Sequence, residues 1–348
     1  MLIIDAHLDL AWNALQWNRD LRQSVLTIRA QETGAALAGP GRGMNTVALP
    51  ELREGRVALC FATMLARATG NPVPHLDFRS PEQASAIAQG QLAYYRALAR
   101  AGELHIIEAL PALEDHMRAW TAWETADASD AAPSLGVVLA MEGADPILDP
   151  GQLPEWWAAG LRVLGPVHYG PCRYGGGTGT ELPLTPQGLD LLDAMAEVGM
   201  VLDLTHFSDP AFRQALERFE GPVLASHNNC RALVPHQRQF SDTQIRAIVA
   251  RDGVIGVACD AWMLQLGWVT GRSTNDDVRL TDVVDHIDHI CQLTGTSRHA
   301  AIGSDLDGGF GGEQSPHDLD TIVDLQRIPD LLSERGYASL DIDNIMHG

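Results

Sequence analysis

The sequence has few of the features that mark secreted, membrane-spanning or nucleic-acid-binding proteins. Its five cysteines are widely spaced and form no C-x-x-C pair, so neither a disulfide framework nor a thiolate zinc site is indicated. No apolar run reaches the roughly 18 residues of a membrane span, and the N-terminus shows no cleavable leader. Lys and Arg number 24 against 45 Asp and Glu, a formal charge of −21 that repels nucleic acid and anionic lipid. We therefore expect a cytoplasmic protein with no nucleic-acid partner and no membrane partner.

What the sequence does contain is an alternation of short apolar runs and helical segments. Eight runs have the length of buried strands, and most are followed by a segment with helix caps and helical periodicity. Residues 10–56, after the first run, lack this pattern and are expected to be irregular. The 348 residues are therefore predicted to form one α/β domain, a (β/α)8 TIM barrel with an irregular insertion after the first strand.

Ionisable residues follow all but one of these runs. In order along the chain, the runs end at His7/Asp9, Leu65, Glu142, His168, His206, His227, Asp260 and Asp305. In a barrel the carboxyl ends of all strands meet at one face, whereas a doubly wound open sheet, the competing fold, spreads them along a line. Convergence of so many reactive side chains favours the barrel.

Five of these residues are of the types that bind metal ions. His7 and Asp9 are two positions apart on a strand, so their side chains point the same way. With Glu142, His206 and His227 they are enough to hold two cations, each with an open position for water. Glu142 is the best bridge, because the other four then divide into two pairs. Water held between two cations loses its proton near neutral pH, so the predicted reaction class is metal-assisted hydrolysis.

Five stretches resemble, in order and spacing, the successive signatures of the renal or membrane dipeptidase family, peptidase family M19. They are Asp5-Ala6-His7-Leu8-Asp9, Met141-Glu142-Gly143, residues 203–208 (DLTHFS), Ala225-Ser226-His227 and residues 303–308 (GSDLDG). The resemblance implies an amidohydrolase-type barrel with two Zn²⁺ ions. It also implies hydrolysis of dipeptides, often with a D-residue at the C-terminal position.

The resemblance also implies individual roles for the site residues. The five metal ligands already named would hold the two zinc ions, with Glu142 as the bridge. His168 matches the family's substrate-polarising histidine, placed to stabilise a developing oxyanion. Arg238 matches the arginine that binds the substrate's terminal carboxylate, a task suited to a planar guanidinium. Asp305 matches the general acid and base, in preference to Asp307, which is expected in the following loop. Family members are often dimers, so a homodimer is expected on this ground alone.

Two further segments are open to interpretation. Asp260 stands where the family commonly shows an asparagine, so it is a candidate substrate contact that would favour a cationic side chain; the alternative is a solvated acid. Residues 175–179 (GGGTG) are expected to form a flexible loop over the site rather than a nucleotide cradle.

Three functions are compatible with these residues. The first is a zinc dipeptidase. The second is another amidohydrolase-type enzyme that acts on N-acyl amino acids or β-lactam-like amides. The third is a binding protein that has kept its metals without catalysing a reaction; the presence of every ligand and of Asp305 argues against it.

Overall fold

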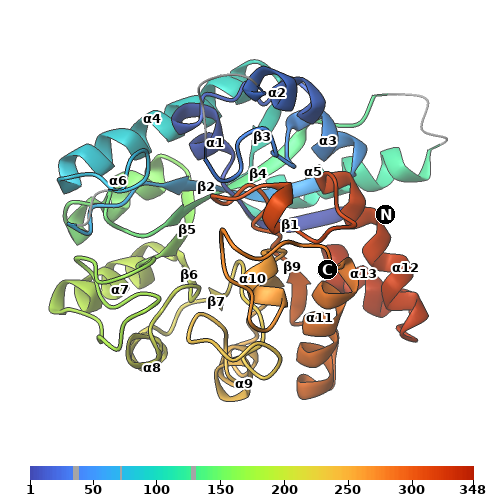
Figure 1. Ribbon diagram of the computed structural model, residues 1–348. Helices are drawn as coiled ribbons and strands as arrows, with labels where there is room; N and C mark the ends of the chain where they lie inside the picture. Colours follow the sequence, from blue (N-terminus) through green and yellow to red (C-terminus); the bar gives the residue numbers. More distant parts are fainter. Residues whose placement is uncertain (34–38, 71–72, 127–130) are drawn as a thin grey trace.

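The computed structural model describes residues 1–33, 39–70, 73–126 and 131–348, and a barrel of parallel strands forms its centre (Figure 1). The strands are hydrogen-bonded in the order β7-β6-β5-β4-β2-β1-β9-β8. A parallel bridge between Ala225 and Ile255 joins the two ends, so the ring is nearly closed. The barrel strands are β1 (Ile3–Leu8), β2 (Val57–Leu65), β4 (Leu135–Glu142), β5 (Leu161–Gly165), β6 (Val201–Asp203), β7 (Val223–Leu224), β8 (Ile255–Val257) and β9 (Ala300–Ile302). The predicted (β/α)8 barrel is confirmed.

The later strands are shorter than predicted, and this matters for the site. Five predicted strand-terminal residues lie three positions beyond the last paired residue of β5 to β9: His168, His206, His227, Asp260 and Asp305. The chain turns out of the sheet there, and His206 and Asp305 adopt positive φ angles of 68° and 55°. Such angles are costly for residues with a Cβ and concentrate at functional sites.

Helices cover the outside of the barrel, as Figure 1 shows. Most begin at a Ser or Thr cap, whose side chain accepts a hydrogen bond from a free N–H of the first turn. Many also carry Pro in the first turn, where its missing N–H costs no hydrogen bond. The helices of the covering layer are α4 (Pro81–Arg100), α5 (Leu110–Thr125), α6 (Leu153–Ala158), α7 (Pro186–Val198), α8 (Asp209–Arg218), α9 (Asp242–Val249) and α11 (Leu280–Thr294). The short helix α10 (Ala261–Leu264) is not in this layer and lies near the centre of the view in Figure 1. A short outer strand that was not predicted, β3 (Leu104–Ile106), pairs with β4.

Two segments differ from the prediction. The segment after β1 is not irregular, because it contains α1 (Leu10–Gln16), α2 (Val25–Glu32) and α3 (Leu49–Glu54), each only six to eight residues long. After β9, where one helical segment would complete the predicted alternation, the chain instead forms a 3-10 helix at Ile322–Arg327, then α12 (Ile328–Glu334) and α13 (Ser339–His347). In the described parts of the chain, no helix combines the length and the apolar character required to cross a membrane.

Candidate active site

The candidate site is a cavity of about 380 Å³ at the carboxyl end of the barrel. Its wall includes eight of the nine residues predicted from the sequence: Asp9, Glu142, His168, His206, His227, Arg238, Asp260 and Asp305. The ninth, His7, lies directly beneath them, and its Nε2 is 3.7 Å from carboxylate oxygens of both Asp9 and Glu142. The fold therefore brings together residues separated by almost three hundred positions.

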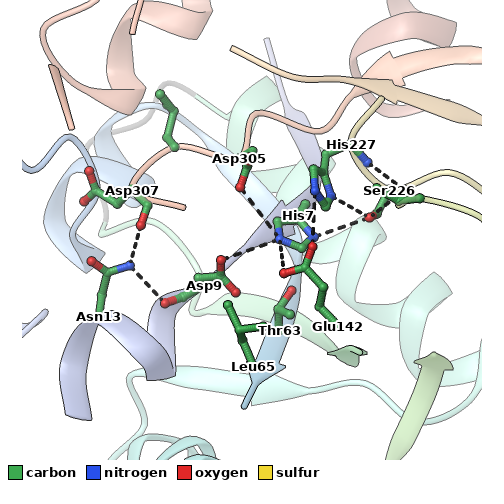
Figure 2. Close-up of polar contacts among 12 residues, drawn as sticks. His7, Asp9, Asn13, Thr63, Leu65, Glu142, Ser226, His227, Asp305 and Asp307 are labelled. Carbon is green, nitrogen blue, oxygen red and sulfur yellow. Dashed lines mark hydrogen bonds and ion pairs between the residues drawn. The ribbon is translucent and has the colours of Figure 1, made fainter. Parts of the chain in front are cut away.

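Glu142 lies at the centre of this group, with one oxygen facing each ligand pair (Figure 2). Its Oε2 is 3.7 Å from His7 Nε2, and its Oε1 is 3.0 Å from His206 Nε2 and 3.3 Å from His227 Nε2. Among the described residues, two of the three compact sets of ligand atoms contain Glu142, namely His7–Asp9–Glu142 and Glu142–His206–His227; the third is His7–His227–Asp305. A carboxylate shared by two sets in this way is suited to bridging two cations.

Unsatisfied buried atoms support a cation in each set. His7 Nε2, Asp9 Oδ1 and Glu142 Oε1 are among the buried side-chain atoms of the described residues that have no hydrogen-bond partner. His206 Nε2 and His227 Nε2 lie 3.1 Å apart, a hydrogen-bond distance at which one ring must carry its proton on Nε2; without that proton the two lone pairs would repel. Burying polar atoms without partners costs free energy, whereas a metal ion would satisfy all of them together. Imidazole and carboxylate are also the ligand types that Zn²⁺ accepts.

The charge states of the site point the same way. Burial, followed by the charge of Arg238, lowers the pKa of His206 well below its usual value, and burial together with the charge of His7 does the same for His227. Burial would also lower the pKa of His7, but the carboxylates of Glu142, Asp9 and Asp305 outweigh it and raise the pKa to about 10. The carboxylates thus require positive charge beside them, and a bound cation supplies it.

Two buried aspartates that the sequence analysis did not identify hold the ligand-bearing turns in place. Asp5 accepts hydrogen bonds from the backbone of His7 at 3.1 Å and of Ser304 at 2.9 Å, which ties the end of β1 to the turn after β9. Asp203 accepts from the backbone of Thr205 and of Ser226, both at 3.0 Å, and ties the turn after β6 to the turn after β7. Both aspartates occur in the signature stretches, but their pairing partners are distant in sequence.

Residues 175–179 do not form the flexible loop that was predicted. Residues 175–178 are buried, and Gly177 bridges to Phe207. A Cβ on Gly177 would lie 1.7 Å from the carbonyl oxygen of His168, so only glycine fits this close approach. The loop is packed against the site, and Thr178 places its hydroxyl 3.0 Å from Nδ1 of His206.

Arg238 reaches the cavity from the loop after β7 and is 3% exposed. Its guanidinium donates to the carbonyl oxygen of His227 at 2.8 Å and to the side-chain oxygen of Asn228. Its Nε has no hydrogen-bond partner among the described residues, so donor capacity is left for a ligand. The side chain of Asn228 thus orients this arginine.

His168 and Asp305 lie on opposite sides of the ligand sets. His168 Nε2 is 3.6 Å from Glu142 Oε1, and its ring contacts the ring of His206 with centroids 4.3 Å apart. Asp305 Oδ1 is 3.8 Å from His7 Nε2. Burial raises the pKa of Asp305 well above its usual value.

Asp260 is buried, so the solvated alternative is wrong. It caps α10, and its Oδ1 accepts from Gln314 Nε2 at 2.8 Å. Burial raises its pKa to about 7. The opposite wall of the cavity is apolar and includes Trp12 and Trp17, which come from the segment after β1. This wall was not predicted, because the segment after β1 was expected to be irregular.

Comparison with known proteins identifies the family. The model of the membrane dipeptidases, peptidase family M19, matches residues 1–348. An uncharacterized Klebsiella pneumoniae protein from the pqqA 5′ region is 32% identical over 221 residues, which are 61% of this chain and 78% of that protein. Dipeptidase tcpJ of Claviceps purpurea is 29% identical over 184 residues, which are 52% of this chain and 37% of that protein.

Solved structures agree with this assignment at the level of the fold. The dipeptidase AC superposes with a TM-score of 0.77 at 23% identity, covering 100% of this chain and 96% of that one. A metallopeptidase from Rhodobacter sphaeroides, liganded with a phosphinate mimic of L-Ala-D-Ala, gives 0.77 at 22% identity with the same coverage. Because the family model matches the chain over its whole length, this protein belongs to the membrane dipeptidases of peptidase family M19, a family of metal-dependent dipeptide hydrolases.

Proposed function

We propose that this chain hydrolyses the peptide bond of dipeptides with two zinc ions bridged by Glu142. The observation that carries the proposal is the division of the two Glu142 oxygens between His7 and Asp9 on one side and His206 and His227 on the other. Bound between these ligands, the ions would supply an activated water as nucleophile and would polarise the scissile carbonyl.

The protein's own residues would bind and orient the substrate and move its protons. Arg238 would hold the terminal carboxylate through its free Nε–H and an N–H of the same edge of the guanidinium group that the protein does not use. His168 Nε2 would donate to the carbonyl oxygen as negative charge develops there. Asp305 would accept the proton of the attacking water and deliver it to the leaving amine, for which its raised pKa is suited.

The size of the cavity supports a dipeptide rather than a longer peptide. Its volume of about 380 Å³ lies at the small end of the range for ligand sites. The Rhodobacter sphaeroides metallopeptidase is described with a mimic of L-Ala-D-Ala. By analogy, we propose that this chain accepts a D-residue at the C-terminal position. Asp260, buried in the wall, would favour a substrate with a cationic group near it.

The test is a hydrolysis assay with measurement of metal content. The purified chain should bind two zinc ions and cleave members of a dipeptide library that varies the C-terminal residue in both chiralities. Asp305→Asn should bind both ions and lose at least a hundredfold in kcat, on the order expected for general acid–base catalysis. If the chain binds two ions but cleaves only N-acyl amino acids or β-lactam-like amides, the substrate class is wrong. If it cleaves none of these, the binding-protein alternative is favoured. The homodimer and the cytoplasmic location stay predictions.

A further inference from the structure

Ser226 lies between two histidines that belong to different ligand sets. Its Oγ is 3.3 Å from Nδ1 of His7 and 2.9 Å from Nδ1 of His227 (Figure 2). The two rings are in contact, with centroids 3.8 Å apart, and Ser226 is 2% exposed. One buried hydroxyl group therefore contacts one ligand of each proposed metal ion.

The hydrogen-bonding capacity of a hydroxyl group matches this arrangement. A neutral imidazole that binds a cation through Nε2 carries its proton on Nδ1, so each Nδ1–H needs an acceptor. The serine oxygen has two lone pairs and can accept from both rings, and its own proton can be donated to Thr205 Oγ1 at 3.4 Å. If both rings were protonated at Nε2 instead, the single hydroxyl proton could satisfy only one of them.

The backbone of Ser226 is held firmly, which fixes the position from which its hydroxyl group reaches the two rings. Its N–H donates to Asp203 Oδ1 at 3.0 Å. Its carbonyl oxygen packs against Gly303, where an added Cβ would lie 1.8 Å away, and against Gly256, where the distance would be 2.1 Å. The backbone of β8 at Gly256 and of the turn after β9 at Gly303 thus approaches Ser226 at distances that only glycine permits.

The remaining histidine ligand uses a separate hydroxyl group. Nδ1 of His206 lies 3.0 Å from Thr178 Oγ1, and Thr178 in turn can donate to the carbonyl oxygen of His206 at 3.3 Å. Thr178 therefore contacts one ligand set only. Thr178, which contacts one set, can therefore be compared with Ser226, which contacts both.

We infer that Ser226 is a positioning residue common to both metal ions, because it fixes the tautomer and ring orientation of His7 and His227 together. This inference rests on the two-metal site of the proposed function but not on its substrate. Loss of such a partner typically weakens metal binding by about 10–100-fold. Here a substitution at Ser226 should weaken the binding of both ions, whereas loss of the Thr178 hydroxyl group should weaken the binding of only one.

The experiment is a zinc titration of the metal-free chain against a chromophoric chelator. Ser226→Ala should weaken both binding steps by about 10–100-fold, and Thr178→Val only one. Ser315→Ala is the matched control, because it removes an equally buried hydroxyl that donates to the Gly311 carbonyl, away from the ligands, and it should retain both affinities. NMR of histidine-¹⁵N-labelled, metal-free protein should show two rings gaining Nε2–H character in Ser226→Ala alone.

Two results would overturn the inference. In the first, Ser226→Ala binds both ions with the affinities of the wild type. In the second, it lowers the affinity of one binding step only, as expected for Thr178→Val. The dipeptide assay separates this outcome from failure of the proposed function. A wild-type chain that binds two ions without cleaving dipeptides would refute the substrate and leave the role of Ser226 intact. A wild-type chain that binds fewer than two ions would refute both.

Discussion

Replacing Asp307 by alanine is expected to detach the segment after β1 from the mouth of the barrel. The Asp307 carboxylate is 1% exposed and accepts from the backbone N–H of Thr46 at 2.7 Å and of Val47 at 3.1 Å. It also accepts from the Thr46 hydroxyl at 2.9 Å and lies 3.5 Å from Arg19 Nη1. With alanine at position 307, these N–H and O–H donors would remain buried without an acceptor.

The expected cost follows from these contacts. Three hydrogen bonds to a charged acceptor contribute about 1.5–3 kcal/mol each. Burial of the charge offsets part of this gain, because it raises the pKa of Asp307 to about 6 even though Arg19 and these hydrogen bonds act in the opposite direction. The net loss should be about 3–5 kcal/mol, the range found when one partner of a buried charged network is removed. For a chain of 348 residues this lowers Tm by about 4–7 °C.

Thermal and urea unfolding of the metal-free chain would measure this loss. Asp307→Asn should lose less stability than Asp307→Ala, because its one side-chain oxygen can still accept from Thr46. It should not match the wild type, because its NH2 group would face the remaining donors. Asp320→Ala is a suitable control, since it removes a carboxylate that pairs with Arg29 at 2.7 Å but is 72% exposed, and such pairs contribute about 0–1 kcal/mol. A loss in Asp307→Ala no larger than in Asp320→Ala would refute the reasoning.

Four further outcomes are expected. Chelation should lower Tm and abolish dipeptide cleavage until zinc is restored; cleavage that survives complete metal removal would contradict the proposed site. Arg238→Lys should raise KM about 10–100-fold for dipeptides but not for dipeptide amides, as steady-state kinetics would show. Asp260→Asn should reduce the kcat/KM preference for cationic over neutral dipeptides, and an unchanged preference would exclude the contact. Burial lowers the pKa of His286 to about 3 in the folded chain. Between pH 6.5 and that value only the unfolded chain protonates this histidine, so the free energy of unfolding should fall by about 1.4 kcal/mol for each pH unit of acidification. In urea unfolding between about pH 6 and pH 4, His286→Gln should remove this contribution to the pH dependence.

The sequence predicted the barrel and its reactive face because both depend on local patterns. Runs such as Val57–Leu65 are apolar on both faces, as a strand covered on both sides must be, and the structure has this strand with the same bounds. His7 and Asp9 were placed together by the alternation of side chains along a strand, and they do belong to one ligand set, although β1 ends at Leu8 and Asp9 stands at the N-cap position of α1. The ends of parallel strands meet at one face of a barrel, so the remaining ligands followed from their positions alone.

What the sequence did not predict depends on contacts between distant residues. The strands before His206 and Asp305 end three residues early, because the turns are held by Asp203 and Asp5 rather than by ladder pairing. Asp307 was expected in a loop, but it is buried by donors about 260 positions away, at Thr46 and Val47. No periodicity or cap in the sequence reports such a pairing. The short helices α1 to α3 were missed for a related reason, since helices of this length are stabilised by packing rather than by their own sequence.

The central claim is that two metal ions share the Glu142 carboxylate, and anomalous diffraction at the zinc edge tests it most directly. Crystals of the zinc-loaded chain should show two peaks about 3.5–4 Å apart. One should lie among His7, Asp9 and Glu142, and the other among Glu142, His206 and His227. A single peak, or two peaks that do not both contact Glu142, would contradict the claim.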